Sequence, residues 1–317
     1  MNKVYTTSRI LELISIDLNL SIEEYKRISR IYSHLGNWIK QDSLKRFKAD
    51  STIYAHGSLA LGAITKTFDK DKKYDLDLIY CRHLSSISQL ELMDQIEAQL
   101  QDYIKDNSRP QEPMEIYRWP QCITIYIGDD FSIDVVPAIP DCESIKKYIF
   151  KQDKGISTVD STLYPWQYSN PKGYAEWFST KDNQQIEAEK RSAFLANKAA
   201  DVDVERLPLQ ECMIETPLKK ANQILKRHRD IHFQKNKDLK PSSIIITTLA
   251  TKAYGQEDDL IEALKSISSN MVKGIDHNKN GEKVVYDPTF FRFGKFEPGN
   301  FAKEWLENPE FEESFHN

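Results

Sequence analysis

Glycine, proline and cysteine are scarce in this 317-residue sequence, which contains 11, 13 and 4 of them respectively. So little glycine and proline excludes a collagen-like or low-complexity chain, and a hydrophobic content of 40% excludes a disordered one. The cysteines include no CxxC pair, so we interpret them as free thiols of a reducing compartment rather than as zinc ligands or disulfides. They are Cys81, Cys122, Cys142 and Cys212.

Long apolar runs are also missing. The most apolar stretch, 241–251, lies between Lys240 and Lys252 and is far shorter than a bilayer requires. Charged residues such as Arg9 and Glu12 interrupt the N-terminal region, so we expect no signal peptide. The sequence therefore predicts a cytoplasmic protein without a membrane partner.

Positive charge is not in excess. The chain carries 43 Lys and Arg against 48 Asp and Glu, which gives a formal charge of −5. Because each phosphate contact needs a nearby cation, we expect no stable nucleic-acid partner, and any such binding must be confined to a patch.

The apolar pattern of the first half is typical of a mixed α/β structure. Ser21 and Glu24 form a capping box, and apolar residues then recur at helical spacing. Gly128-Asp129-Asp130 has the composition of a tight hairpin turn. The expected helices cover 21–45, 59–66 and 88–104. The expected strands cover 52–55, 74–81, 122–127 and 131–136.

The second half, from about Trp166, has a mainly helical pattern. Its expected helices cover 174–200, 217–233, 242–254 and 259–273. We therefore predict an α/β (α+β) protein with two lobes. The mixed-sheet lobe covers 1–168 and includes the long helix as a brace, and the helical lobe covers 169–317.

Two carboxylates, Asp75 and Asp77, lie in the predicted strand 74–81. Because strand side chains alternate, both leave one face of the sheet, and the leucines beside them point into the core. At about 6–7 Å apart they repel by roughly 2–3 kcal/mol at an effective dielectric near 20. A bound divalent cation offsets this cost, and Mg²⁺ also leaves coordination sites for phosphates.

A third acid, Asp134, lies in the apolar strand pattern 131–136. Three acids on neighbouring strands suit a two-metal site that holds the attacking and leaving oxygens of a phosphoryl transfer. The alternative is an exposed strand face whose acids are balanced by Lys72 and Lys73.

Gly57 and Ser58 favour the metal-site reading. They lie where a predicted strand ends and a short helix begins. Backbone N–H groups and a serine hydroxyl at such a junction can donate hydrogen bonds to phosphate oxygens. A strand, Gly-Ser, a helix, a strand with two acids and a hairpin with a third acid together form a specific order of elements.

This order resembles the nucleotidyltransferases with a DNA polymerase β-like core. More narrowly, the chain resembles the bacterial CD-NTases, the cyclic-oligonucleotide synthases of CBASS anti-phage systems, which are relatives of cyclic GMP-AMP synthase and oligoadenylate synthase. The resemblance covers roughly residues 20–306. The segments that carry it are 56–62, 74–78, 133–137, 170–178, 225–230, 241–249 and 300–305.

The resemblance implies roles for the acids. Asp75, Asp77 and Asp134 become the ligands of two Mg²⁺ ions, for which Mn²⁺ can substitute. Asp134 is also placed to help activate the attacking hydroxyl.

The resemblance implies a donor triphosphate site as well. Gly57 and Ser58 become contacts to this triphosphate. Lys226 and Ser242 match positions that touch it from the helical lobe, and Ser243 is an equal alternative to Ser242. The other reading of Lys226 is that it belongs to an ordinary solvated helix face.

The implied reaction begins when a hydroxyl of one nucleotide attacks the α-phosphate of a second and pyrophosphate leaves. Ring closure then gives a cyclic di- or trinucleotide from nucleoside triphosphates, ATP among them. A downstream effector of the product and a CBASS regulatory partner are also implied. The rivals are a transferase that makes linear oligoadenylate or modifies protein or RNA, a catalytically silent nucleotide-binding module, and a nucleic-acid binder built on the helix around 219–229.

Overall fold

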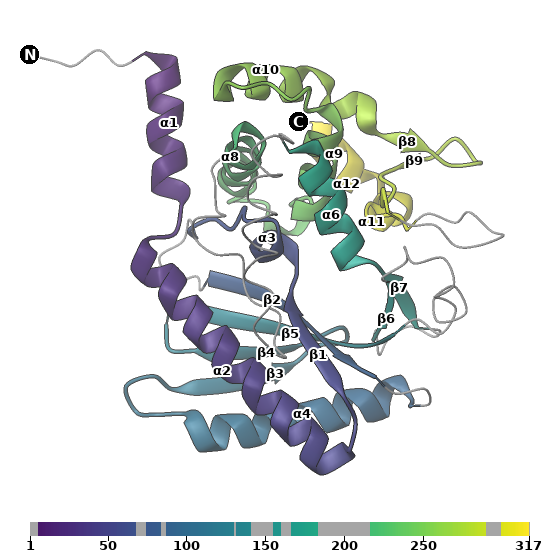
Figure 1. Cartoon of the computed structure of the whole chain (residues 1–317). Coiled ribbons are helices and arrows are strands. Elements are labelled where there is room, and N and C mark those ends of the chain that lie inside the picture. Colours follow the sequence, from purple (N-terminus) through teal and green to yellow (C-terminus); the bar gives the residue numbers. More distant parts are fainter. Residues whose placement is uncertain are drawn as a thin grey trace, which may run out of the picture.

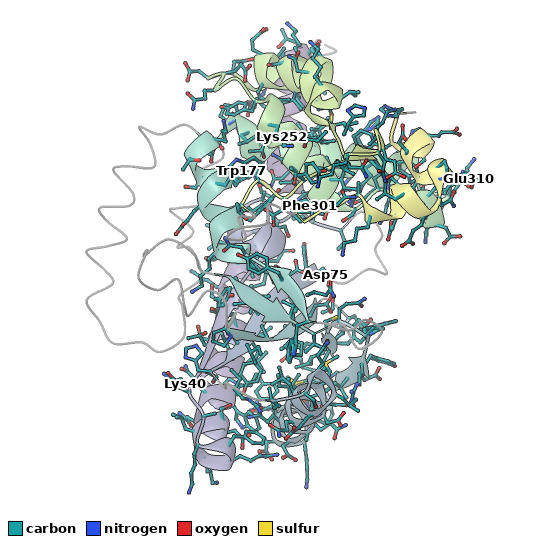
Figure 2. The ribbon with its side chains drawn as sticks, turned by 90° about the vertical axis from the view of Figure 1, so that its right-hand side faces the viewer. Lys40, Asp75, Trp177, Lys252, Phe301 and Glu310 are labelled. Atoms are coloured by element: carbon teal, nitrogen blue, oxygen red, sulfur yellow. The ribbon has the colours of Figure 1, made fainter. Side chains whose placement is uncertain are left out.

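The computed structural model of the chain describes residues 6–67, 74–83, 87–129, 131–140, 155–159, 166–182, 216–289 and 299–316. A sheet and two long helices form one half, and a group of helices forms the other (Figure 1). In the view turned by 90°, Lys40 lies in the sheet half, and Trp177 and Lys252 lie in the helical half (Figure 2). The predicted α/β (α+β) fold class is confirmed.

The main sheet is mixed. In spatial order it contains β1 (Ser51–Ala55), β2 (Tyr74–Arg82), β5 (Phe131–Pro140), β4 (Ile123–Ile127) and β3 (Met114–Arg118). β2 and β5 run parallel, whereas the other neighbours along this path are antiparallel. Beyond the end of β4, β6 (Ile156–Thr158) pairs with β5 and also with β7 (Gln167–Ser169).

The predicted hairpin between the third and fourth expected strands is confirmed. Ile127 pairs with Phe131 across the turn, and Gly128 has a φ of 55°, a conformation that glycine adopts at little cost. The expected helix over 59–66 is wrong, because α3 covers only Gly57–Ala60 and the chain then continues without helix. Gly62, with a φ of 63°, lies just beyond the end of this helix.

One face of the sheet is covered by α2 (Ile22–Phe47) and α4 (Gln89–Asn107), and these match the helices predicted over 21–45 and 88–104. The capping box of Ser21 and Glu24 is present, with both of its hydrogen bonds. Alternate residues of β2 and β5 enter this core, because strand side chains alternate between faces. The buried core residues include Ile28, Leu35, Leu76, Leu78, Leu92, Ile96, Ile133 and Val135.

The helical half contains α6 (Pro171–Lys181), α8 (Pro217–His232), α9 (Ser243–Ala253) and α10 (Leu260–Asn270). The expected helix over 174–200 ends at Lys181, and residues 183–200 lie outside the described part of the chain. The smaller elements are η3 (Lys237–Leu239), η4 (Met271–Gly274), β8 (Asp276–His277), β9 (Lys283–Val284), α11 (Lys303–Glu307) and α12 (Pro309–His316).

A helix that the sequence pattern did not predict, α1 (Thr7–Leu18), joins the two halves. It packs against α8 and α10 of the helical half, and its Leu11 contacts that core. The next helix, α2, packs against α4 and β1 of the sheet half. The bracing role predicted for 21–45 is therefore shared between two consecutive helices, while the boundary near residue 168 stays a prediction. Within the described ranges, no helix is both long and apolar enough to span a bilayer.

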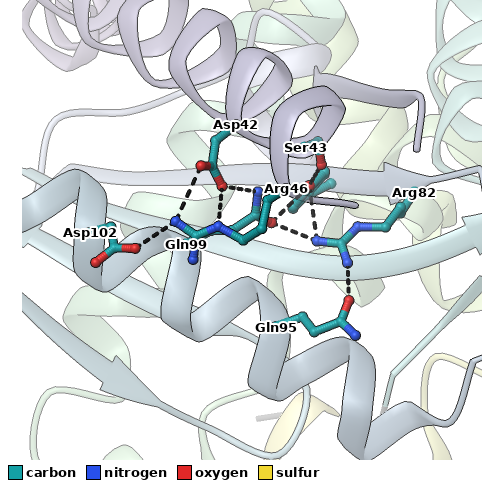
Figure 3. Close-up of polar contacts among 8 residues, drawn as sticks. Asp42, Ser43, Arg46, Arg82, Gln95, Gln99 and Asp102 are labelled. Carbon is teal, nitrogen blue, oxygen red and sulfur yellow. Dashed lines mark hydrogen bonds and ion pairs between the residues drawn. The ribbon is translucent and has the colours of Figure 1, made fainter. Parts of the chain in front are cut away.

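A buried arginine holds α2, α4 and β2 together (Figure 3). The side chain of Arg82 is 0% exposed and donates hydrogen bonds to the side-chain oxygens of Gln95 and Gln99. Its guanidinium also lies 4.2 Å from the ring centroid of Phe47. A buried cation is costly unless such partners satisfy it, so this network is a constraint on how the two helices pack.

We expect Arg82→Leu to lower the free energy of unfolding by about 3 kcal/mol, because it removes the donor to the half-buried Gln95 oxygen and one of the two donors to the buried Gln99 oxygen. Arg30→Leu, at an exposed position of α2, is the matched control and should change it by less than about 0.5 kcal/mol. Urea unfolding of both variants measures the difference. Equal stabilities would contradict a structural role for Arg82.

Candidate active site

The three predicted acids lie on the face of the sheet opposite α2 and α4. The parallel register of β2 and β5 places Asp77 directly opposite Asp134 and Asp75 opposite Ser132. Residues directly opposite each other on neighbouring strands share a face, so all three carboxylates leave the sheet on one side. Leu76 between them is buried in the core, as predicted. The structure therefore brings Asp75, Asp77 and Asp134 together.

The burial and the neighbouring acids in this arrangement disfavour the charged form of Asp77. Burial, followed by the charges of Asp75 and Asp134, raises its pKa to about 7, while Lys226 lowers it. Burial also raises the pKa of Asp134, against the effect of a hydrogen bond from Thr124. A carboxylate with a pKa near neutrality is strongly destabilised in its charged form, and a cation near Asp77 would relieve that.

The fit of this site to a divalent cation depends on its donors. Carboxylate oxygens from two adjacent strands are the ligands that Mg²⁺ prefers, and the raised pKa of Asp77 marks uncompensated negative charge. Among the described residues, no three Asp, Glu, His or Cys side chains already surround a single point. The acids thus suit an open site that shares its ions with a phosphate ligand rather than a closed protein cage.

Gly57 begins α3 immediately beside the acids. Its φ is 58°, and a Cβ built on it would lie 2.3 Å from Oδ2 of Asp77. Only glycine fits here, because any side chain would meet both the strained backbone and this carboxylate. The backbone N–H of His56 also donates to the carbonyl oxygen of Asp77, at 2.9 Å. The Gly-Ser turn and the acid-bearing strand are therefore one rigid unit.

His56 lies directly before Gly57 and also lines the cavity between the two halves. Burial lowers the pKa of its imidazole to about 4, so the ring is neutral. Its Nε2 atom is buried and has no hydrogen-bond partner among the described residues.

A cavity of about 580 Å³ opens between the two halves. Its wall on the sheet side includes Gly57, Ser58, Asp75 and Asp77. In Figure 2, Asp75 lies at the end of the sheet half that faces Phe301 of the helical half. The wall on the helical side includes Tyr174, Lys226, Ser242, Ser243, Asp287 and Phe301. One cavity therefore contains all the predicted nucleotide-binding residues and two of the three predicted acids.

Lys226 does not belong to a solvated helix face. It is 6% exposed, and its Nζ lies 3.5 Å from the carbonyl oxygen of Ala63. Burial, helped by the charge of Arg229, lowers its pKa to about 8, while Asp77 and Asp230 raise it. A buried ammonium that faces a cavity is suited to binding an anion, since a phosphate would supply the charge it lacks.

Both candidate serines, Ser242 and Ser243, line the cavity and are exposed. The structure does not separate them. The pattern analysis missed Phe301 and Asp287 as cavity residues, because their positions depend on how distant segments pack, and Tyr174 lines the same cavity. Tyr174 is held by a 2.8 Å hydrogen bond between its hydroxyl and that of Thr248, and its ring lies 5.9 Å from that of Phe301.

We expect Asp77→Asn to stabilise the metal-free protein more at pH 8 than at pH 5. An acid whose folded pKa exceeds its unfolded value of 3.8 destabilises the fold as pH rises towards about 7, and asparagine has no such cost. The advantage of the variant should grow by about 2 kcal/mol between the two pH values, as measured by urea unfolding in chelator. A pH-independent difference would contradict the raised pKa.

Comparisons with known proteins identify a family and similar relatives. Residues 5–182 match the family described as "SMODS: Second Messenger Oligonucleotide or Dinucleotide Synthetase domain". The "c-di-GMP synthase" of Roseivirga ehrenbergii is 25% identical over 312 residues, which cover 98% of this chain and 75% of the relative. The "Cyclic dinucleotide synthase CdnG" of Bradyrhizobium diazoefficiens is 25% identical over 292 residues, which cover 89% and 67%.

Solved structures show the same fold. CdnG of Bradyrhizobium diazoefficiens in complex with GTP superposes with a TM-score of 0.69 at 21% identity and covers 98% of this chain and 89% of that one. The DncV cyclic AMP-GMP synthase of Vibrio cholerae gives a TM-score of 0.54 at 16% identity, with coverages of 87% and 64%. Because the family match takes in more than half of the sequence, this chain belongs to the SMODS family of second messenger oligonucleotide or dinucleotide synthetases and is a nucleotidyltransferase of the bacterial CD-NTase type.

Proposed function

We propose that the protein joins nucleoside triphosphates into a cyclic di- or trinucleotide second messenger and releases pyrophosphate. The observation that carries this proposal is the pairing of Asp77 with Asp134, beside Asp75, next to a cavity lined by Gly57 and Lys226. The acids supply cation ligands, and the glycine backbone and the lysine supply anion contacts. A triphosphate with its metal ions requires both in one place.

The three acids would hold the metal ions beside the α-phosphate. Two Mg²⁺ ions, for which Mn²⁺ can substitute, would neutralise developing charge and lower the pKa of the attacking hydroxyl. Asp75 and Asp77 hold the triphosphate end of the site, while Asp134 lies on the neighbouring strand, where the attacking hydroxyl of the second nucleotide can approach. Either a 2′- or a 3′-hydroxyl can use this geometry.

The triphosphate is held from both halves. Gly57 and Ser58 offer backbone and hydroxyl donors, and Lys226 with Ser242 faces them across the cavity. Tyr174 and Phe301 line the same cavity and are suited to pack against a base. The relatives named as c-di-GMP and cyclic dinucleotide synthases favour a guanine substrate and a two-nucleotide ring, alongside the ATP that we predict from the sequence.

The biological setting follows from the CD-NTase resemblance. We place the reaction in the cytoplasm and in anti-phage defence of the CBASS type. There the product binds a downstream effector, and a regulatory partner controls the synthase.

We expect the double variant Asp75→Ala/Asp77→Ala to lose product formation by at least about 1,000-fold, because both cation ligands on β2 are removed. Purified protein is incubated with all four nucleoside triphosphates and Mg²⁺ or Mn²⁺, and the products are analysed by mass spectrometry. Asp129→Asn, an exposed acid in the hairpin turn, is the control that keeps activity.

The outcomes of this assay separate the alternatives. A metal-dependent product without free phosphate ends, missing from the double variant, supports cyclisation. A linear product would overturn cyclisation in favour of oligoadenylate-type synthesis. Full activity of the double variant would overturn the assignment of the acids.

We expect Lys226→Met to raise the KM for nucleoside triphosphate by about 10- to 100-fold, since a charge-assisted hydrogen bond contributes about 1.5–3 kcal/mol. Methionine keeps the length of the side chain in a buried position, so the fold should persist. Lys235→Met, on an exposed residue outside the cavity lining, is the control with unchanged KM. An unchanged KM in Lys226→Met would contradict its role in phosphate binding.

A further inference from the structure

Two hydroxyl groups lie directly beside the outer acids of the site. The antiparallel register of β4 and β5 places Thr124 opposite Asp134, and the parallel register of β2 and β5 places Ser132 opposite Asp75. Paired residues share a face of the sheet. Both hydroxyls are therefore on the acid-bearing side, away from the core under α2 and α4.

Each hydroxyl donates to one oxygen of its acid. Thr124 Oγ1 lies 2.5 Å from Oδ1 of Asp134, and Ser132 Oγ lies 2.8 Å from Oδ1 of Asp75. The Ser132 hydroxyl is also 3.3 Å from the carbonyl oxygen of Tyr74, but the shorter contact is the one to the carboxylate. A hydroxyl has a single proton, so each acid keeps its second oxygen for another partner.

Burial distinguishes these hydroxyls from ordinary surface groups. Thr124 is 4% exposed and Ser132 is 6% exposed, whereas Asp75 is exposed and Asp134 is only half-buried. A buried strand position that needed only packing would accept valine, which fits a pleated surface at least as well as threonine. The hydroxyl of Thr124 instead donates to the carboxylate of Asp134, which lies directly opposite it on β5.

The surroundings of Asp77 differ from those of the two outer acids. Within the described part of the chain, neither hydroxyl donates to Asp77, and its Oδ2 lies next to Gly57. Asp77 is also the central acid, between Asp75 along the strand and Asp134 across it. The two outer carboxylates are thus fixed by hydroxyls, while the central one has its position set by the packing around it.

We propose that Thr124 and Ser132 are positioning residues that hold the carboxylates of Asp134 and Asp75 in the orientation that binds a divalent cation. This inference rests on the proposed function, because it assumes that these acids are cation ligands. A carboxylate whose Oδ1 is tied cannot rotate freely, so its Oδ2 is directed before the ion arrives. Partners of this kind typically change metal affinity by 10- to 100-fold.

The test is a titration of each protein with Mn²⁺ alone, in which electron paramagnetic resonance measures the free ion. We expect Thr124→Val to weaken Mn²⁺ binding about 10-fold or more, and Ser132→Ala to weaken it similarly. Thr124→Ser keeps the hydroxyl and should stay within about twofold of the wild-type affinity. Thr52→Val, on β1 of the same sheet, is the matched control and should bind as wild type.

The outcomes of the titration test the positioning role of the two hydroxyls separately from the assignment of the acids as cation ligands. Wild-type Mn²⁺ affinity in both Thr124→Val and Ser132→Ala would overturn the inference while leaving the cation site itself intact. Equal weakening in Thr124→Ser and Thr124→Val would also overturn it, since the hydroxyl would then not be the group that matters. A wild-type protein that makes product but binds no Mn²⁺ in the titration, while Asp75→Ala/Asp77→Ala stays active, would instead overturn the proposed ligand assignment.

A second readout separates positioning from a loss of folding. Thr124→Val should need about 10-fold more Mg²⁺ for half-maximal product formation, and its KM for nucleoside triphosphate at saturating Mg²⁺ should be unchanged. A variant that merely unfolds would lose maximal activity at every Mg²⁺ concentration.

Discussion

The parallel pairing of β2 with β5 is the constraint on which the site depends. Its register alone places Asp77 opposite Asp134, and an offset of one residue would turn one of these acids into the hydrophobic core. The register is held by the other face of the same strands, where Leu76 and Ile133 are buried against α2 and α4. The core thus fixes the chemistry on the opposite surface, because each strand can slip only by exposing its apolar residues.

In the protein without ligand, this arrangement disfavours the charged form of Asp77. The pKa of Asp77 rises to about 7 because burial and two neighbouring carboxylates oppose its charge. Rigid packing keeps the acids together despite this repulsion. The turn at Gly57 is bonded to β2 at Asp77, near its start, and the buried network around Arg82 lies at its end, so both parts of β2 are restrained. A site of this kind gains most from ligands that bring positive charge, which is the property expected of a metal–triphosphate site.

Much of this could be predicted from the sequence, for identifiable reasons. Alternation in 74–78 placed two acids on one face, and the capping box at Ser21 located the long helix, because both signals are local. The pairing of Thr124 with Asp134 could also be predicted, because a hairpin that pairs Ile127 with Phe131 must pair these two residues. The cavity residues Tyr174 and Phe301 were not predictable as neighbours, since they come from segments more than 100 residues apart in sequence. α1 was missed because its charges obscured its apolar face.

The wrongly predicted helix over 59–66 shows how the two halves are joined. After α3 the chain instead presents the carbonyl oxygens of residues 63, 64 and 66 to one face of α8. Gln223, Lys226 and Arg227, at i, i+3 and i+4 spacing on α8, contact the carbonyl oxygens of residues 64, 63 and 66 at 2.9, 3.5 and 2.6 Å respectively. The same segment follows directly from Gly57 and Ser58. Any movement of α8 against the sheet must therefore move the Gly-Ser turn or break these contacts, so the donors from the two halves act on a bound triphosphate as one unit.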